Sequence, residues 1–236
     1  MPTARETLVF VHGSGDSAQV WGPLIALLPG YACVALDLPG HGALVAEPGP
    51  TEMGVAEYAT FVRAELARRG LTAPTVVGHS LGGAVALRLA LDAPEVVGRL
   101  ILVGSGARLR VALSYLEAAR VDDPQGQAAI TRVAFAEEHA AQADAWQAER
   151  QPAAPGMLYR DLAACDRFDV LAEVGRISAP TLLIVGAGDR MTPPKYSEYL
   201  RAQLPNSALA IIADAGHYAQ LEQPRAVADA IRQFIG

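Results

Sequence analysis

The sequence is poor in cysteine and has no long apolar run. Its two cysteines, Cys33 and Cys165, lie far apart, so no disulfide framework is expected, and Cys33 is expected to be a buried small apolar residue. No apolar run approaches the roughly 18 residues that a membrane helix needs. The first six residues do not combine a charged region with an apolar one, so no signal peptide is predicted. These absences predict a cytoplasmic protein.

Basic clusters and metal-ligand patterns are also missing. The 236 residues include 19 Lys and Arg against 25 Asp and Glu, which gives a formal net charge of −6. No stripe of Lys and Arg is interleaved with aromatic residues, so nucleic acid is not an expected partner. The histidines are not spaced with Cys or carboxylates as metal ligands are, and we expect neither a metal nor another cofactor. The five histidines are His12, His41, His79, His139 and His217.

Short β-branched and aliphatic runs alternate with helix-length segments along the chain. The apolar runs are continuous, as in strands that are covered on both faces. This alternation predicts an α/β fold with a doubly wound parallel sheet, whose functional residues collect at the carboxyl ends of the strands. The strands are expected at residues 7–11, 32–36, 75–77, 100–103, 181–185 and 209–212. The helices are expected at 18–28, 55–69, 81–91, 195–203 and 225–235.

Residues 105–175 break this alternation. The stretch is rich in alanine, lacks a strand-like run and carries helix patterns at 109–120 and 128–150. A Pro-rich segment, 152–156, precedes a shorter helix near 157–165. We predict that 105–175 form a helical cap, or lid, on a core made of residues 1–104 and 176–236. An ordinary long crossover is the alternative, but it would need one helix where this region has room for three or four.

The pentapeptide Gly78-His79-Ser80-Leu81-Gly82 is the most informative motif. It lies between a β-branched run and a helix-like run, which is the setting of a nucleophile elbow. In such a turn the serine hydroxyl stands clear of the backbone, and glycines on both sides leave room where Cβ atoms would collide. Ser80 is therefore the candidate nucleophile.

A serine hydroxyl needs a general base within reach, and the base needs an orienting partner. His217 follows the last strand-like run and is the candidate base. Asp189 follows the preceding run and is the candidate acid. Asp214 is the competing acid, although its closeness to His217 in the chain suits a loop-capping role better. Taken singly, Asp189 could be a turn residue and His217 a structural loop histidine.

Acyl chemistry also requires hydrogen-bond donors for a tetrahedral oxyanion. One candidate is the backbone N–H of Leu81, directly after the nucleophile and at the positive end of a helix. The second should come from the loop after the first strand, and by position we assign it to the N–H of Ser14. The alternative for this His12-Gly13 segment is a tight turn with a structural histidine.

Together these motifs resemble the α/β-hydrolase superfamily, in the group of small serine esterases with a helical cap. The order Ser80, Asp189, His217 is the order of that family. Family members usually begin with an antiparallel hairpin, and only about six residues precede the first strand here. The resemblance therefore implies a shortened, mostly parallel sheet of about six strands with an exposed edge, in a monomer or homodimer. The matching residues are His12-Gly13, Asp37-Leu38-Pro39-Gly40-His41-Gly42, Gly78 to Gly83, Gly188-Asp189 and Gly216-His217.

The resemblance implies a structural role for Asp37, which is expected to hold its turn. Serine in place of aspartate at position 80 argues against dehalogenase and epoxide-hydrolase chemistry. The leading hypothesis is a carboxylesterase (EC 3.1.1) that cleaves a small or medium acyl ester through an acyl-enzyme. Hydrolysis of a thioester or of a β-diketone C–C bond stays open. A non-hydrolytic ligand-binding receptor is the alternative from another class.

Aromatic residues are the predicted lining of an apolar substrate pocket. For those in the cap, packing between helices is the competing interpretation. Arg108, Arg110 and Arg160 would matter if the substrate carried a carboxylate or a phosphopantetheine group. The predicted substrate-binding residues are Trp21, Tyr115, Phe135, Trp146 and Tyr218.

Overall fold

The computed structural model describes residues 6–50, 52–151 and 153–236. Two predictions concern residues outside this description. Residues 1–5 belong to the N-terminal segment for which no signal peptide is predicted, and Pro152 belongs to the Pro-rich segment. Within it, six strands form one sheet in the order β2-β1-β3-β4-β5-β6, and every pair is parallel. The predicted doubly wound parallel sheet is confirmed. The strands are β1 (Thr7–Val11), β2 (Ala32–Leu36), β3 (Thr75–His79), β4 (Arg99–Val103), β5 (Thr181–Gly186) and β6 (Ser207–Ile212).

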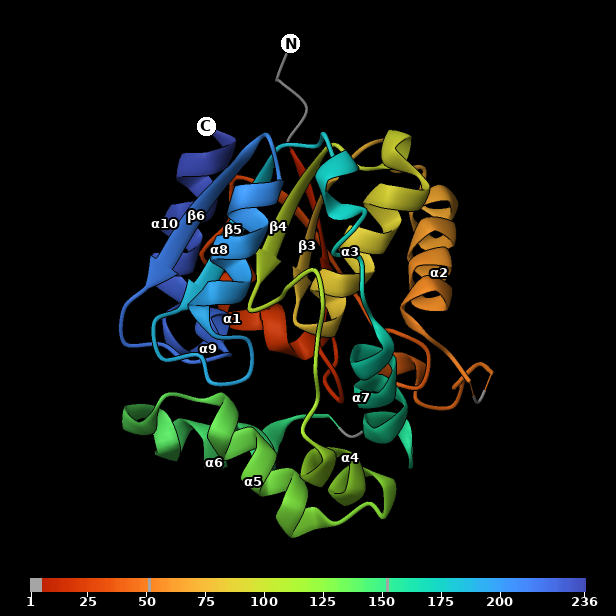
Figure 1. The fold of residues 1–236 in the computed structure, drawn as a ribbon, viewed down its shortest axis with the longest axis vertical. Helices are drawn as coiled ribbons and strands as arrows, with labels where there is room; N and C mark the ends of the chain where they lie inside the picture. The colour runs from red at the N-terminus through yellow and green to blue at the C-terminus, as the bar shows by residue number, and fades with distance from the viewer. Residues whose placement is uncertain (1–5, 51, 152) are drawn as a thin grey trace.

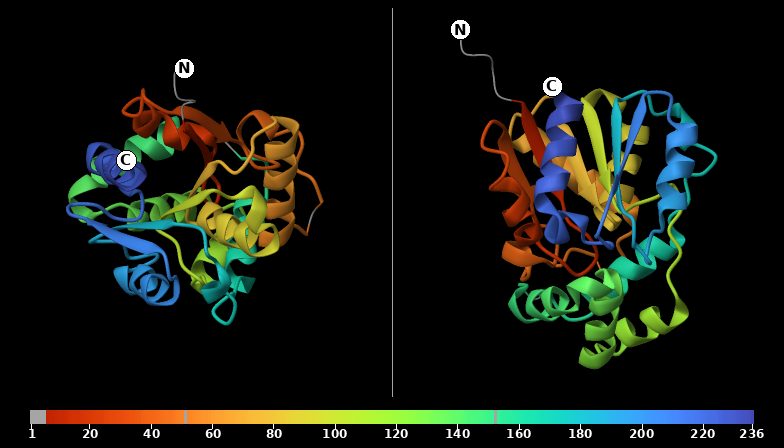
Figure 2. Two further views of the ribbon diagram at one scale, coloured as in Figure 1. Left: turned by 90° about the horizontal axis from the view of Figure 1, so that it is seen from above. Right: turned by 90° about the vertical axis from the view of Figure 1, so that its left-hand side faces the viewer.

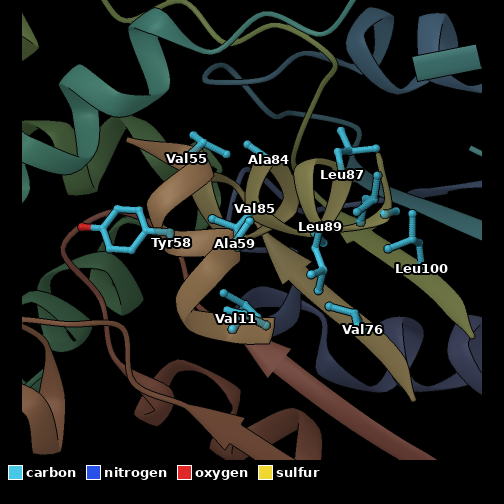
Figure 3. Packing of buried hydrophobic residues seen from close by; sticks show 14 of the residues in the cluster. Val11, Val55, Tyr58, Ala59, Val76, Ala84, Val85, Leu87, Leu89 and Leu100 are labelled. Carbon is cyan, nitrogen blue, oxygen red and sulfur yellow. The ribbon is translucent and has the colours of Figure 1, made fainter. Parts of the chain in front are cut away.

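Helices cover both faces of the sheet (Figures 1 and 2). On one face, α2 (Val55–Arg68), α3 (Leu81–Asp92) and α8 (Pro194–Gln203) pack on the strand residues that point toward them. Figure 3 shows side chains of α2 and α3 interdigitating with Val11 and Val76 of the sheet. On the other face, α1 (Gly22–Ile25), α9 (Ala219–Glu222) and α10 (Pro224–Ile235) enclose a second apolar cluster. Because both faces are buried, successive strand residues are apolar and the strand pattern could be recognised in the sequence.

Outside residues 105–175, two details differ from the sequence predictions. The helix expected at 18–28 is a 3₁₀ turn, Ala18–Trp21, followed by the short α1. Cys33 lies on the edge strand β2 and is only half-buried, so the prediction of a buried side chain is wrong. Further 3₁₀ turns span Gly42–Leu44, Pro94–Val96, Glu137–His139 and Val174–Arg176. Among the described helices, none is both long and apolar enough to cross a membrane.

Four helices lie between β4 and β5 in the chain, and α4, α5 and α6 extend across the carboxyl ends of the strands (Figures 1 and 2). The single helix predicted at 128–150 is wrong, because the backbone is extended at Phe135 and Ala136. Phe135 enters the core, and the Ala136 N–H donates to the buried Glu222 carboxylate at 2.8 Å, so the helix ends there. The four helices are α4 (Leu113–Arg120), α5 (Pro124–Ala134), α6 (Ala140–Glu149) and α7 (Met157–Arg167).

Candidate active site

Ser80 stands between the end of β3 and the start of α3 in a strained backbone conformation. Its φ of 52° and ψ of −114° lie outside the regions that L residues prefer. The turn is held because the Ser80 N–H donates to the Val103 carbonyl at 3.0 Å and the Ser105 hydroxyl donates to the Ser80 carbonyl at 2.9 Å. A Cβ at Gly82 would lie 2.1 Å from the Val11 oxygen, so the predicted need for space there is confirmed.

Asp189 and His217 meet beyond the ends of β5 and β6. The distance from Asp189 Oδ2 to His217 Nδ1 is 2.9 Å, and both side chains are buried. The carboxylate can only accept, so Nδ1 carries the proton and Nε2 keeps its lone pair. Asp214, the competing acid, is exposed, and its carbonyl accepts from His139 Nε2 and from the Gln223 side chain. Asp189 is thus the carboxylate that the fold brings to the histidine.

Three donors from the following turn hold the Asp189 carboxylate. The N–H groups of Met191 and Thr192 donate to Oδ1 at 2.8 Å, and the Thr192 hydroxyl donates to Oδ2 at 2.9 Å. Burial opposes ionisation, but His217 and these donors outweigh it and lower the pKa of Asp189 to about 2. Sequence reasoning did not assign Thr192 a role, although a Thr three residues after an Asp in a turn is a recognisable signal.

Ser80 and His217 border the same cavity of about 250 Å³ at the carboxyl ends of the strands. The structure gives no hydrogen bond between the Ser80 hydroxyl and His217. Such contacts are often long without substrate and tighten when it binds. Apolar and polar residues both line the cavity. Besides Ser80 and His217 it is lined by Ser14, His79, Leu109, Arg110, Val111, Ala112, Tyr115, Gln127, Ile130, Thr131, Ala134, Arg150, Leu158, Leu162, Cys165, Arg190, Met191, Thr192 and Tyr218.

The two backbone donors expected from the sequence have no partner of their own. In the part of the chain that the structure describes, neither the Ser14 N–H nor the Leu81 N–H donates a hydrogen bond. Leu81 is the first residue of α3, where the helix leaves its N–H groups unpaired, and Ser14 lines the cavity. An oxygen atom that develops negative charge would satisfy such donors.

The histidines of the two loops beside Ser80 are neutral and structural. His12 Nδ1 donates to the Gly13 carbonyl at 2.8 Å, and Nε2 accepts the Leu38 N–H at 3.0 Å. Burial, followed by the nearby His41, lowers the pKa of His12 to about 4. His79 Nε2 donates to the His217 carbonyl at 3.0 Å, and burial holds its pKa well below the ordinary value. These side chains fix the loops that carry Ser14 and His217.

The predicted substrate-binding residues divide into two groups. Tyr115 and Tyr218 line the cavity, which agrees with their prediction as pocket residues. Trp21, Phe135 and Trp146 pack in or against the apolar core instead and do not border the cavity. Trp21 lies on Phe10, with ring centroids 5.1 Å apart, and Phe135 stacks on Tyr218 at 4.8 Å. An aromatic residue produces the same apolar pattern in the sequence whether its side chain packs in the core or lines a pocket.

Several lining residues were not assigned from the sequence, above all Arg150, Arg190 and the α7 residues Leu158 and Leu162.

Asp37 holds its turn as expected, since its carboxylate accepts the N–H groups of Ala18 and Ala43 at 2.7 and 2.9 Å. Within the described ranges, His, Cys, Asp and Glu side chains form no group of three or more that could hold a metal ion.

Comparisons with known proteins find similar chains among hydrolases. Residues 8–230 match the sequence profile of the alpha/beta hydrolase family. The chain is 32% identical over 253 residues to the pimeloyl-(acyl-carrier protein) methyl ester esterase of Neisseria meningitidis serogroup C, covering 100% of this chain and 95% of that protein. A solved thermophilic esterase is similar with a TM-score of 0.81 and 35% identity, covering 99% of this chain and 90% of that one. A hydrolase from Pseudomonas aeruginosa PA01 gives a TM-score of 0.89 at 26% identity, covering 98% and 90%.

Proposed function

The chain belongs to the alpha/beta hydrolase family and is a carboxylesterase-type hydrolase, and from this premise we propose that Ser80, His217 and Asp189 are its catalytic triad. The observation that supports the triad most directly is the buried 2.9 Å contact between Asp189 and His217 on a cavity that Ser80 also borders. The helices of residues 105–175 are proposed as the cap over this cavity. The cytoplasmic location and the monomeric or homodimeric state stay predictions.

In the proposed reaction, Ser80 Oγ attacks the ester carbonyl carbon and its proton passes to His217 Nε2. The carbonyl π electrons become an oxyanion, which the N–H groups of Ser14 and Leu81 would bind. Collapse of this intermediate breaks the C–O bond, and the alcohol leaves with the proton from His217. Water then gives a proton to His217 and attacks the acyl carbon, the bond from this carbon to Ser80 Oγ breaks, and the carboxylic acid leaves as Ser80 regains its proton. Asp189 keeps the His217 ring in the tautomer that this cycle needs.

The proposed substrate is an ester of a small or medium acyl chain. A cavity of about 250 Å³, whose lining includes the apolar side chains of Leu158, Leu162 and Ile130, suits such a chain. Hydrolysis of p-nitrophenyl esters from acetate to decanoate tests this, with a maximum expected at short or medium length. An acyl-CoA and a β-diketone assayed beside them test the thioester and C–C alternatives.

Arginines at the cavity favour a finer candidate, an ester whose far end is anionic. Arg110, Arg150 and Arg190 line the cavity, and no Asp or Glu among the described residues does. Arg190 is 3.4 Å from Glu137, whereas Arg110 and Arg150 have no carboxylate within 4.0 Å among the described residues. Relatives are named as esterases of a pimeloyl-(acyl-carrier protein) methyl ester. A methyl ester with a terminal carboxylate should have a higher kcat/KM than its methyl-terminated counterpart.

The triad itself is tested with Ser80→Ala on p-nitrophenyl butyrate. We expect loss of turnover with an unchanged circular dichroism spectrum, because the hydroxyl removed is the nucleophile. Ser178→Ala, at an exposed serine that does not line the cavity, is the matched control and should keep full activity. Undiminished turnover in Ser80→Ala would contradict the assignment of Ser80 as the nucleophile. Absence of turnover in the wild type would favour the ligand-binding receptor.

A further inference from the structure

Helix α7 carries a buried carboxylate, Asp161, that reaches back to the loop after β1. Its side chain is fully buried, and its Oδ2 accepts the N–H of Gly15 at 2.9 Å. Gly15 follows Ser14, which the proposed function makes a donor to the oxyanion. We propose that Asp161 is a positioning residue that fixes this loop so that the Ser14 N–H points at the reacting oxygen. This inference rests on the proposed function.

The loop forms a turn that needs an external support. The Asp16 N–H donates to the Gly13 carbonyl at 3.3 Å, and Gly15 has a φ of +69° at the third position of the turn. A positive φ at this position belongs to a type II turn, which becomes type I when its central peptide rotates. Glycine offers little resistance to that rotation. The N–H that Asp161 holds is the N–H of this central peptide, so Asp161 fixes the peptide that begins at Ser14 and, through it, the backbone next to the Ser14 N–H.

Helix α7 also contacts the loop on either side of Asp161. A Cβ on Gly15 would lie 2.9 Å from Leu158 Cδ1, so the loop packs directly against that side chain. Cys165 Sγ is 3.6 Å from Ser14 Oγ. Positions 158, 161 and 165 share one face of a helix. Asp161 therefore lies in the middle of the α7 surface that packs against the loop.

The surroundings of Asp161 keep it ionised and fixed. His41 Nε2 lies 2.9 Å from Asp161 Oδ2, while His41 Nδ1 faces the Pro39 carbonyl at 3.2 Å. Burial alone would lower the pKa of His41, but the nearby Asp161 carboxylate outweighs it and raises that pKa, which favours an ionic pair. Burial alone would raise the pKa of Asp161, but His41 and the other donors outweigh it and lower that pKa.

The second carboxylate oxygen of Asp161, Oδ1, is held by a residue of α2. The Tyr58 hydroxyl donates to Asp161 Oδ1 at 2.5 Å, and Arg160 Nε donates to the same hydroxyl at 3.0 Å. Figure 3 shows this hydroxyl pointing away from the apolar cluster that its ring joins. The hydrogen bonds of the Tyr58 hydroxyl thus go to Asp161 and Arg160 and not to the loop, so Tyr58 provides the matched control.

The test compares Asp161→Ala with Tyr58→Phe on p-nitrophenyl butyrate. Asp161→Ala should lower kcat about 30- to 100-fold and leave KM within about 3-fold, since a shift of about 1 Å in a catalytic group can cost about 100-fold in rate. Tyr58→Phe removes a hydrogen bond from the same carboxylate and should lower the melting temperature, with kcat within about 2-fold. Asp161→Asn keeps the size and one acceptor and should restore part of kcat. If Asp161→Ala does not fold, Asp161→Asn is compared with Tyr58→Phe instead.

A trifluoromethyl ketone separates positioning from general damage. Ser80 Oγ bonds to its carbonyl carbon, the proton goes to His217, and the carbonyl oxygen becomes an anion in the proposed oxyanion site. Asp161→Ala should weaken this inhibitor by about the same factor as kcat and leave the affinity of the corresponding alcohol unchanged.

Equal kcat values in Asp161→Ala and Tyr58→Phe would overturn the inference, as would equal losses of affinity for ketone and alcohol. If the wild type neither hydrolyses the ester nor binds the ketone, the proposed function fails instead.

Discussion

Asp189 Oδ2 lies 2.9 Å from His217 Nδ1, and this contact joins the loops that follow two neighbouring strands, β5 and β6. The parallel sheet makes the meeting possible, because its strand ends all face the same side. The Thr192 hydroxyl reinforces it, lying 2.9 Å from Asp189 Oδ2 and 3.2 Å from His217 Nδ1. The ring is thereby held with Nδ1 protonated and Nε2 available as a base.

Asp189→Asn should keep the fold and lower kcat by about 10³- to 10⁴-fold. The amide can donate to Nδ1, which favours the tautomer with the proton on Nε2 and removes the base. Steady-state kinetics with p-nitrophenyl butyrate measure the loss. Asp214→Asn is the control and should stay within about 2-fold of the wild type, since it is the carbonyl of Asp214 that its neighbours contact. A large loss in Asp214→Asn with activity kept in Asp189→Asn would reverse the assignment of the acid.

Gly82→Ala should lower the free energy of unfolding by about 3 kcal/mol and abolish activity. Its Cβ would lie 2.1 Å from the Val11 carbonyl oxygen and 2.7 Å from that of His12, and these backbone atoms cannot move aside as the end of a flexible side chain could. Gly30→Ala is the control, because nothing lies within 4 Å of its Cβ. Urea denaturation compares the two variants. Similar stabilities would show that α3 can shift away from β1 at little cost.

The sequence was sufficient for the sheet and the proposed triad because both follow from short-range patterns. Strands that are buried on both faces are continuous apolar runs, and the functional side chains follow directly after them. Ser80 could be recognised from its two flanking glycines, and Asp189 and His217 from their places after β5 and β6. These features need no knowledge of which distant residues touch.

Contacts between distant residues could not be predicted in this way. Asp161 has no motif of its own, and its partners Gly15 and Tyr58 are 146 and 103 residues away. The break at Phe135 is likewise caused by packing on Tyr218 and by Glu222, far along the chain. Trp21 was predicted to bind substrate, yet its apolar side chain suits the core as well as a pocket. Pattern alone cannot distinguish these two environments.

Asp16→Asn should stabilise the protein more at pH 8 than at pH 4.5. Asp16 is buried, its Oδ2 accepts the Tyr218 hydroxyl at 3.0 Å, and its Oδ1 has no partner among the described residues. Burial raises its pKa above the ordinary value, although Arg150 and Tyr218 partly offset this. A carboxyl with a raised folded-state pKa binds its proton more tightly when folded. Its contribution to stability is therefore full at low pH and is lost as pH rises through the folded pKa.

Asparagine does not titrate, so the difference between Asp16→Asn and the wild type should grow with pH in urea denaturation. A difference between Asp16→Asn and the wild type that is the same at both pH values would mean that Asp16 is not destabilised by burial of its charge.

Ser80→Gly should be more stable than Ser80→Ala, although both should be inactive. A residue with a side chain at φ 52° and ψ −114° carries strain of about 1–3 kcal/mol, and glycine relieves it. Glycine also gains about 1 kcal/mol of freedom in the unfolded chain, which offsets part of this benefit. The expected net gain over alanine is about 1 kcal/mol in the free energy of unfolding, measured by urea denaturation. If alanine proves equally stable, the turn imposes no strain on Ser80.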